Sequence, residues 1–143
     1  MKDILSKIIN ELKISLKEVD PGNRIILAVY LFGSNVDLGA GSDSDLDLAF
    51  LLNEKSYRND PLSTVVPAYL AATSLAMSLG RETDVTILNS ASLEIAYEVV
   101  SMGRCLLENE TDKRMEYEIA LRGMYFDFKP FLEELRFNCI SNL

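Results

Sequence analysis

The sequence predicts one domain of the mixed α/β (α+β) class, with helices packed on one face of a small mixed β-sheet and a long C-terminal helix. The chain has 143 residues, the size of a single domain, and 48% of them are apolar, which is enough for one core. Segments with strand composition alternate with segments whose apolar residues recur at helical spacing. No repeat, low-complexity tract or linker interrupts this order. We therefore expect a single domain over residues 1–143, with its core in 24–108 and a helical segment in 110–143.

The first half of the chain predicts two helices and two strands. Residues 3–19 repeat apolar residues every three or four positions, which is typical of an amphipathic helix. Residues 24–32, RIILAVYLF, and 45–52, DLDLAFLL, have the composition of strands. A largely apolar helix is expected over residues 61–79. Asp60 is its possible cap, Pro61 lies in its first turn, Gly80 ends it, and Pro67 either kinks it or moves its start.

The second half predicts two further strands and two further helices. Residues 82–88 read as a third strand, and a helix capped by Ser90 or Ser92 is expected to run to about Met102, before Gly103. Residues 104–108 form a short strand or an extended piece. Residues 110–137 predict a long helix that is broken or bent near Pro130.

The composition excludes several kinds of site. The chain has no histidine, which removes Ser-His and Cys-His nucleophiles and zinc sites that use histidine. Its two cysteines, Cys105 and Cys139, lie far apart without a CxxC pattern, so we expect free thiols. Any metal site must use oxygen ligands, which favours Mg²⁺, Mn²⁺ or Ca²⁺.

The charge restricts the partners. The formal net charge is −8, and the longest basic feature is the pair Lys113-Arg114, so a nucleic-acid substrate is disfavoured. A basic protein, or a small nucleotide accompanied by cations, remains compatible with this charge. No apolar run approaches the ~20 residues of a membrane span, and the N-terminus lacks the apolar core of a signal peptide, so we expect a cytoplasmic protein.

Two carboxylates stand at the start of the second expected strand. Side chains alternate between the faces of a strand, so Asp45 and Asp47 share one face while Leu46 and Leu48 face the core. Neighbouring carboxylates repel each other, and a divalent cation offsets that repulsion. If the strand at 82–88 is a neighbour, Asp84 lies beside them. Three such carboxylates suit a two-metal phosphoryl-transfer site.

The pair Gly33-Ser34 directly follows the first expected strand. Glycine lets the backbone approach a phosphate closely, and the serine hydroxyl is a further donor. Taken singly, each feature has a plainer interpretation: Gly33-Ser34 as a strand-to-turn break, Asp45 and Asp47 as a strand edge, Asp84 as a surface carboxylate. GSDSD alone could be a polar turn or a weak calcium loop. The combination between two apolar strands favours phosphoryl transfer.

These residues carry a family resemblance. Gly33-Ser34, ten further residues, Asp45-Leu46-Asp47 and then Asp84 in TDVTIL resemble the minimal nucleotidyltransferase (MNT) family of the DNA polymerase β-like superfamily. The resemblance covers roughly residues 25–108, and YFDFKPFLEELR at 125–136 looks like the tail helix of MNT antitoxins. It implies a polymerase β-like nucleotidyltransferase fold.

The resemblance also implies an activity and a partner. MNT antitoxins pair with a HEPN-domain ribonuclease toxin and transfer AMP from ATP to one of its tyrosines, which silences it. By the same resemblance, Gly33 and Ser34 would contact the β- and γ-phosphates, and Asp45 and Asp47 would hold two Mg²⁺ ions. Asp84 would bind the catalytic ion and help to deprotonate the acceptor hydroxyl.

The sequence departs from the family at one point. Members often carry a basic residue, commonly arginine, shortly after the Gly-Ser pair, whereas residues 35–39 here read NVDLG. Triphosphate binding would then be weaker, or Arg58, Arg81 or Lys129 would serve instead.

Two other functions remain besides that of a protein adenylyltransferase. A non-catalytic antitoxin would neutralise the toxin by binding alone, and a nucleotidyltransferase for a small molecule would usually need an additional domain. The aromatic residues of 117–137 are expected to pack in the core or to form a partner-binding face.

Overall fold

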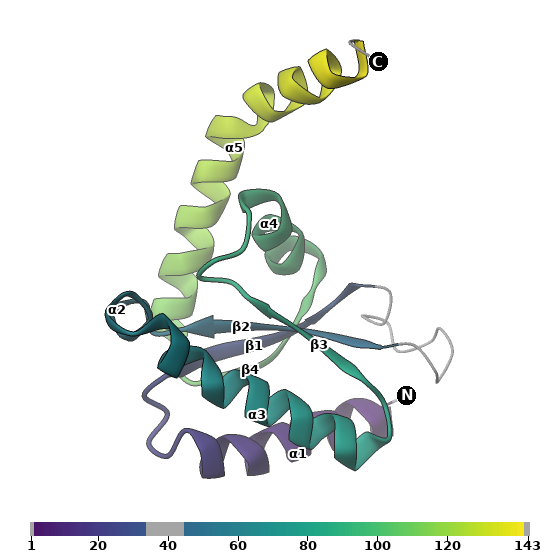
Figure 1. The fold of residues 1–143 in the computed structure, drawn as a ribbon, viewed down its shortest axis with the longest axis vertical. Coiled ribbons are helices and arrows are strands. Elements are labelled where there is room, and N and C mark those ends of the chain that lie inside the picture. The colour runs from purple at the N-terminus through teal and green to yellow at the C-terminus, as the bar shows by residue number, and fades with distance from the viewer. Residues whose placement is uncertain (1, 34–44, 142–143) are drawn as a thin grey trace.

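The computed structural model describes residues 2–33 and 45–141 (Figure 1). Its elements, in chain order, are α1 (Lys2–Val19), β1 (Ile26–Phe32), β2 (Leu46–Leu52), α2 (Glu54–Asn59), α3 (Pro61–Leu79), β3 (Thr83–Ile87), α4 (Leu93–Met102), β4 (Arg104–Glu108) and α5 (Thr111–Ser141). All the expected strands and helices are present, and α2 is an addition. It begins at Asn53, whose side chain accepts a hydrogen bond from the Ser56 amide, and it has no buried residue.

The four strands form one mixed sheet in the order β3-β2-β1-β4. β1 is antiparallel to β2 and to β4, whereas β2 and β3 run parallel. The expected mixed sheet is therefore confirmed, and β2 and β3 are neighbours, which is the condition on which the placement of Asp84 depended.

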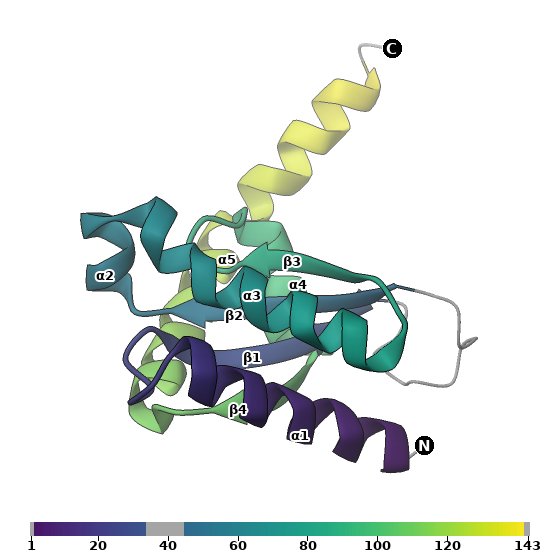
Figure 2. The ribbon, with the colours of Figure 1, turned by 60° about the horizontal axis from the view of Figure 1, so that its bottom comes forward.

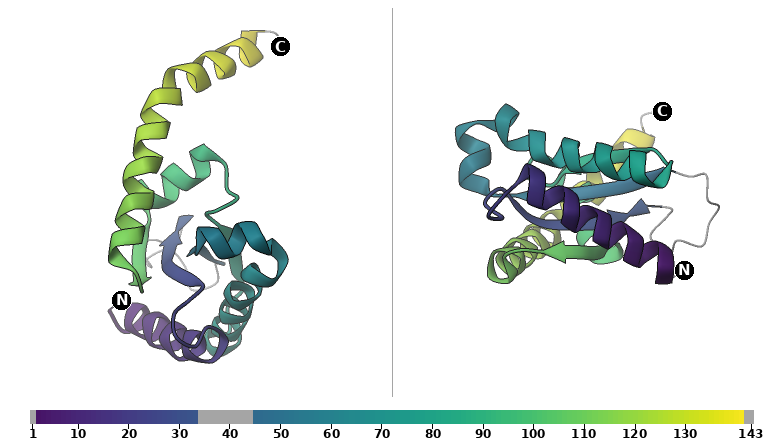
Figure 3. Two further views of the ribbon diagram at one scale, coloured as in Figure 1. Left: turned by 90° about the vertical axis from the view of Figure 1, so that its left-hand side faces the viewer. Right: turned by 90° about the horizontal axis from the view of Figure 1, so that it is seen from below.

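Helices cover both faces of this sheet. α1 and α3 lie on one side, with a core that includes Ile8, Leu48 and Leu75. α4 and α5 lie on the other side, with a second core that includes Ala49 and Val99. Figures 2 and 3 show the sheet between the two helical layers. The expectation that the helices pack on one face was wrong, because β1 and β2 are buried on both sides along almost their whole length.

Specific caps set the ends of α3. The Asp60 side chain accepts a hydrogen bond from the Ser63 amide, and Pro61 occupies the first turn, as expected. Gly80 ends the helix in the left-handed conformation, at φ 65°. Pro67 lies inside the helix and is buried, so it does not move the start.

α3 is also apolar enough for a membrane span. Among the described residues it is the one helix with that length and composition, with a mean hydropathy of 1.4 over its window. Its Ala68, Ala71 and Leu75 belong to the core on the α1 side of the sheet. One face of α3 therefore packs in the core, and 33% of the window is buried.

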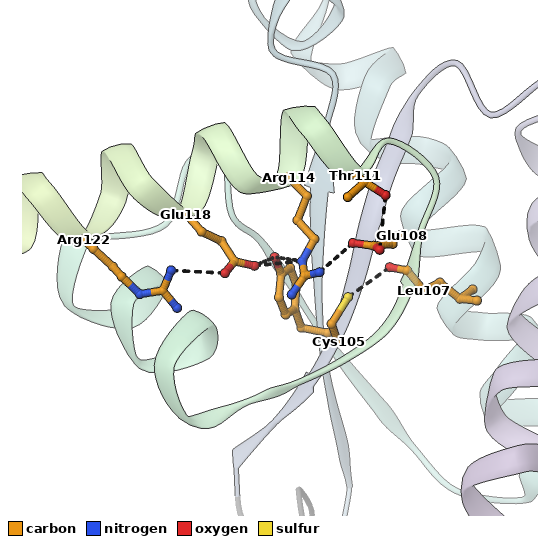
Figure 4. A network of polar contacts seen from close by, with 8 residues as sticks. Cys105, Leu107, Glu108, Thr111, Arg114, Glu118 and Arg122 are labelled. Atoms are coloured by element: carbon orange, nitrogen blue, oxygen red, sulfur yellow. Dashed lines mark hydrogen bonds and ion pairs between the residues drawn. The ribbon is translucent and has the colours of Figure 1, made fainter.

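A polar network fastens the first half of α5 to the sheet (Figure 4). The buried Tyr30 hydroxyl of β1 donates to Glu118 Oε2 at 2.7 Å, and Arg114 Nε donates to the same oxygen at 2.8 Å. Arg114 also binds Glu108 of β4 at 2.6 Å, and Arg122 binds Glu118 at 3.3 Å. Burial, followed by the hydrogen bond to Glu118, raises the pKa of Tyr30, so its hydroxyl keeps its proton and remains a donor.

The second half of α5 extends away from the sheet. The helix is continuous through Pro130, and Figure 1 shows it changing direction before its yellow C-terminal part. The expected bend is therefore present without a break. Proline removes one backbone hydrogen bond within a helix and crowds the preceding turn, which accounts for the change of direction.

Candidate functional site

The paired strands β2 and β3 bring the acidic residues together. Asp47 and Asp84 are direct partners in the parallel register, so their side chains share one face of the sheet. Asp45 lies two residues before Asp47, just ahead of the first strand residue, Leu46. The Leu46 amide donates to the Glu82 carbonyl at 2.9 Å, which aligns the starts of both strands. The three sequence-predicted carboxylates therefore come from one edge of the sheet.

The proximity of the three carboxylates affects the pKa of Asp47. Burial, followed by the charges of Asp84 and Asp45, raises the pKa of Asp47 above its ordinary value. A side-chain hydrogen bond with Asp84 acts in the same direction. Asp45 and Asp84 are exposed, whereas Asp47 is partly buried. The site therefore holds its central carboxylate under repulsion that an added cation would relieve.

Gly33 borders this carboxylate. It follows β1 directly, in the left-handed region at φ 81°. A Cβ at this position would lie 2.3 Å from Asp47 Oδ2. Both the conformation and the contact require glycine. Ser34, the other half of the predicted phosphate cradle, lies outside the described residues.

Gly103, which follows α4, lies against the end of β1 at the same edge of the sheet. A Cβ on Gly103 would lie 2.4 Å from the Val99 carbonyl oxygen, 3.0 Å from that of Leu31 and 3.2 Å from Phe32 Cβ. The residue thus allows α4 to approach the end of β1, next to Gly33. From the sequence, Gly103 was predictable only as a helix stop, because Leu31 and Phe32 are distant in the chain.

The oxygen ligands suit Mg²⁺ together with a nucleotide. Within residues 2–33 and 45–141, which include Asp45, Asp47 and Asp84, no group of three acidic or thiol side chains is arranged to hold a metal ion. Mg²⁺ commonly takes one or two carboxylates and completes its shell with water and substrate phosphates. The closely placed Asp47 and Asp84, with the raised pKa of Asp47, fit that mode.

The three candidate bases for the triphosphate differ in position. Arg58 belongs to α2, beyond the opposite end of β2 from Asp47, where it pairs with Glu54 at 3.2 Å. This position removes it as a triphosphate ligand. Arg81 immediately precedes Glu82 at the carboxylate edge, and Lys129 lies in the second half of α5. Of the three, Arg81 is therefore the one whose backbone lies beside the starts of β2 and β3.

A cavity of about 400 Å³ lies away from this edge. It is lined by residues that follow β2, including Asn53 and Lys55, and by Lys113 and Tyr117 of α5. These positions are at the far end of β2 from Asp47. This cavity is therefore separate from the site formed by the carboxylates.

Comparison with known proteins identifies the domain. Residues 14–112 match the family model described as polymerase beta, nucleotidyltransferase. No curated protein matches the chain. The matched residues include β1, β2, β3 and all three acidic residues.

Several solved structures share the fold. A toxin–antitoxin with AMP-PNP is 21% identical, with a TM-score of 0.66, and covers 92% of this chain and 98% of the matched chain. A tri-AMPylated Shewanella oneidensis HEPN toxin in complex with an MNT antitoxin has 21% identity and a TM-score of 0.66, covering 95% and 98%. A mutant toxin–antitoxin MntA-HpeT has 21% identity and a TM-score of 0.68, covering 92% and 98%. The similarity thus extends over nearly the whole of each matched chain. Because the family model matches more than half of the length of this chain, the chain belongs to the polymerase beta nucleotidyltransferase family.

Proposed function

We propose that this protein is an antitoxin that transfers AMP from ATP to a tyrosine of a cognate HEPN ribonuclease toxin and so neutralises it. The observation that carries the proposal is the register pairing of Asp47 with Asp84 beside Gly33, within a nucleotidyltransferase domain. Similar folds occur in a toxin–antitoxin with AMP-PNP and in a complex containing a tri-AMPylated HEPN toxin. Both support nucleotide transfer to a protein.

The carboxylates supply the electrostatic part of the reaction. Asp45 and Asp47 would hold the cations that accompany the triphosphate, and Asp84 would complete the site from the neighbouring strand. Bound Mg²⁺ ions would neutralise phosphate charge and lower the pKa of the attacking hydroxyl. Gly33 lets the backbone come close to the β- and γ-phosphates, and Ser34 adds its hydroxyl, as the family resemblance implies.

The transfer is a single displacement at the α-phosphorus. The phenolic oxygen of the toxin tyrosine forms a bond to the α-phosphorus, and the bond from that phosphorus to the bridging oxygen breaks. Pyrophosphate leaves, and the phenolic proton passes to the Asp84 carboxylate. Because Asp84 is exposed, the incoming tyrosine reaches it from solvent.

The proposal is tested by intact-mass spectrometry of the cognate toxin after incubation with this protein, ATP and Mg²⁺. The expected result is a gain of one or more AMP units. The paired substitution Asp45→Asn with Asp47→Asn abolishes the gain, whereas Asp112→Asn, an exposed acidic residue in the first turn of α5, leaves it unchanged. Equal labelling by the doubly substituted protein would overturn the site assignment.

The same variant separates catalysis from neutralisation by binding. If AMP transfer silences the toxin, cells that express the toxin with the doubly substituted protein stop growing. Continued growth would instead assign neutralisation to binding alone. Labelling of a small molecule in place of the toxin would identify the other alternative, a small-molecule nucleotidyltransferase.

A further inference from the structure

The second half of α5 carries large apolar side chains into solvent. In residues 126–139, here called the α5 tail, Phe126, Phe128, Phe131, Leu135 and Phe137 are each between 46% and 69% exposed. Figure 2 shows this part of the helix projecting from the body of the domain. A helical segment of this length is marginal in water without packing, and clustered exposed apolar groups mark interaction sites. The tail therefore has the composition of a binding element.

A groove lies between α4 and α5, beside the tail. A cavity of about 350 Å³ lies between α4 and α5, lined by residues that include Tyr97, Met102, Tyr125 and Arg136. The Tyr97 and Tyr125 rings stack in parallel with centroids 3.7 Å apart, and Arg136 of the tail pairs with a glutamate of α4. The stacked rings join α5 to α4 at the base of the tail, and the exposed ion pair is a second contact between the tail and α4.

The C-terminal end of α4, which lines the groove, lies beside the end of β1. Met102, at the end of α4, is 73% exposed, and the next residue, Gly103, lies against Leu31 and Phe32. Those residues end β1, directly before Gly33. α4 and α5 also cover the face of the sheet to which Asp47 belongs, since Ala49 and Leu51 of the same strand face belong to their core. A protein seated on the tail and groove therefore lies on the side of the sheet to which Asp47 belongs.

The charges around the groove favour a basic occupant. Five acidic side chains belong to the tail or to α4, against two basic ones: Glu94, Glu98, Asp127, Glu133 and Glu134, with Lys129 and Arg136. A second copy of the chain, itself at net charge −8, would be repelled. A partner with a basic surface and an apolar helix face complements both the charge and the aromatic residues.

We propose that the α5 tail and the groove beside α4 form the docking surface for the protein acceptor, and that this surface presents the acceptor's tyrosine to Asp47 and Asp84. The identity of the acceptor, the HEPN toxin, rests on the proposed function. The polar network around Arg114 and Glu118 anchors the base of the helix, so the tail is held at a fixed place relative to the site.

The test measures binding separately from transfer. Surface plasmon resonance is run with the purified cognate HEPN toxin, without ATP, on full-length protein carrying Asp47→Asn. Adding Phe128→Ser and Phe131→Ser is expected to weaken Kd by at least about 100-fold, as expected for two aromatic anchors. The matched control is Leu62→Ser with Met77→Ser on α3, where the same kind of exposed apolar side chain is removed, at 83% and 81% exposure. The control is expected to bind as the parent does.

Hydrogen exchange provides a second measurement that does not depend on substitution. Toxin binding is expected to slow exchange in residues 126–139 and to leave residues 61–79 unchanged. Equal affinity of the tail variant and its parent, protection on α3 in place of the tail, or a dimer of this chain through the tail would each overturn the proposal. If the tail variant loses binding and the wild type transfers no AMP to the toxin, the docking surface is retained. That result rejects only the proposed function.

Discussion

Asp47→Asn tests the repulsion at the carboxylate edge without any partner. Asp47 and Asp84 are direct register partners, and side chains in such positions lie about 5 Å apart. Two unit charges at that distance repel by about 3 kcal/mol at an effective dielectric of about 20 and by about 1 kcal/mol in bulk water. Because Asp84 is exposed, the lower figure applies. The metal-free variant is therefore expected to be about 1 kcal/mol more stable than the wild type, a rise in Tm of about 4 °C.

The pH dependence follows from the raised pKa of Asp47. An acid whose pKa is raised in the folded state contributes stability below its unfolded pKa, about 4, and loses that contribution as the pH rises through the folded pKa. The advantage of the variant is therefore greatest above the folded pKa of Asp47 and disappears as the pH approaches 4. Mg²⁺ at pH 7.5 is expected to raise the Tm of the wild type and to have little effect on the variant.

The assay is thermal unfolding followed by circular dichroism, with and without Mg²⁺, from pH 4 to pH 8. Asp127→Asn is the control, because it removes the same charge from an exposed position on α5. If Asp47→Asn lowers Tm in the metal-free protein, or if both variants shift Tm equally, repulsion at the Asp47 carboxylate does not determine the stability change. Either result refutes the reasoning.

Three further substitutions test the supporting structure. Gly33→Ala introduces a strained backbone conformation and a Cβ against Asp47; it should cost about 1–2 kcal/mol of stability and at least about 10-fold in AMP transfer, and unchanged kinetics would contradict the close approach. Tyr30→Phe removes a donor from Glu118 and is expected to cost about 1–2 kcal/mol in urea unfolding, whereas a neutral result would mean that Arg114 and Arg122 satisfy that carboxylate without it. Asp60→Ala removes the cap of α3 and should cost about 1 kcal/mol, as measured by chemical denaturation; Asp60→Asn retains an acceptor and should restore most of it.

The element order was predictable because the local signals agreed with one another. Asp60-Pro61 and Gly80 marked the ends of α3, and Ser92, one of the two candidate caps, caps α4 through a hydrogen bond from the Ile95 amide. α2 was not predicted, since its six residues have no apolar periodicity and none is buried. Its one signal was Asn53, a good capping residue directly after a strand.

The coverage of both sheet faces was missed although the sequence contained its signal. ILAVYLF in β1 and AFLL in β2 are continuous apolar runs, and such runs are typical of strands covered on both sides. The alternation of Asp45 and Asp47 with apolar residues favoured a sheet with one covered face. The alternation is confined to the exposed start of β2, where no helix covers Asp45.

The site could be predicted in part. The spacing of Asp45 and Asp47 placed them on one strand face, but the neighbour relation of β2 and β3 needed the topology. Contacts over long sequence separations were beyond a single sequence. Tyr30 and Glu118, for example, are 88 residues apart, and neither residue type nor spacing indicates their pairing.

Anomalous diffraction from Mn²⁺ tests the central claim most directly. Crystals of the chain grown with Mn²⁺ and a non-hydrolysable ATP analogue are expected to show anomalous peaks within coordination distance of Asp47 and Asp84, with the triphosphate beside Gly33. Peaks that lie elsewhere, or a triphosphate bound at the cavity beyond the opposite end of β2, would contradict the assignment of this edge as the nucleotidyl-transfer site.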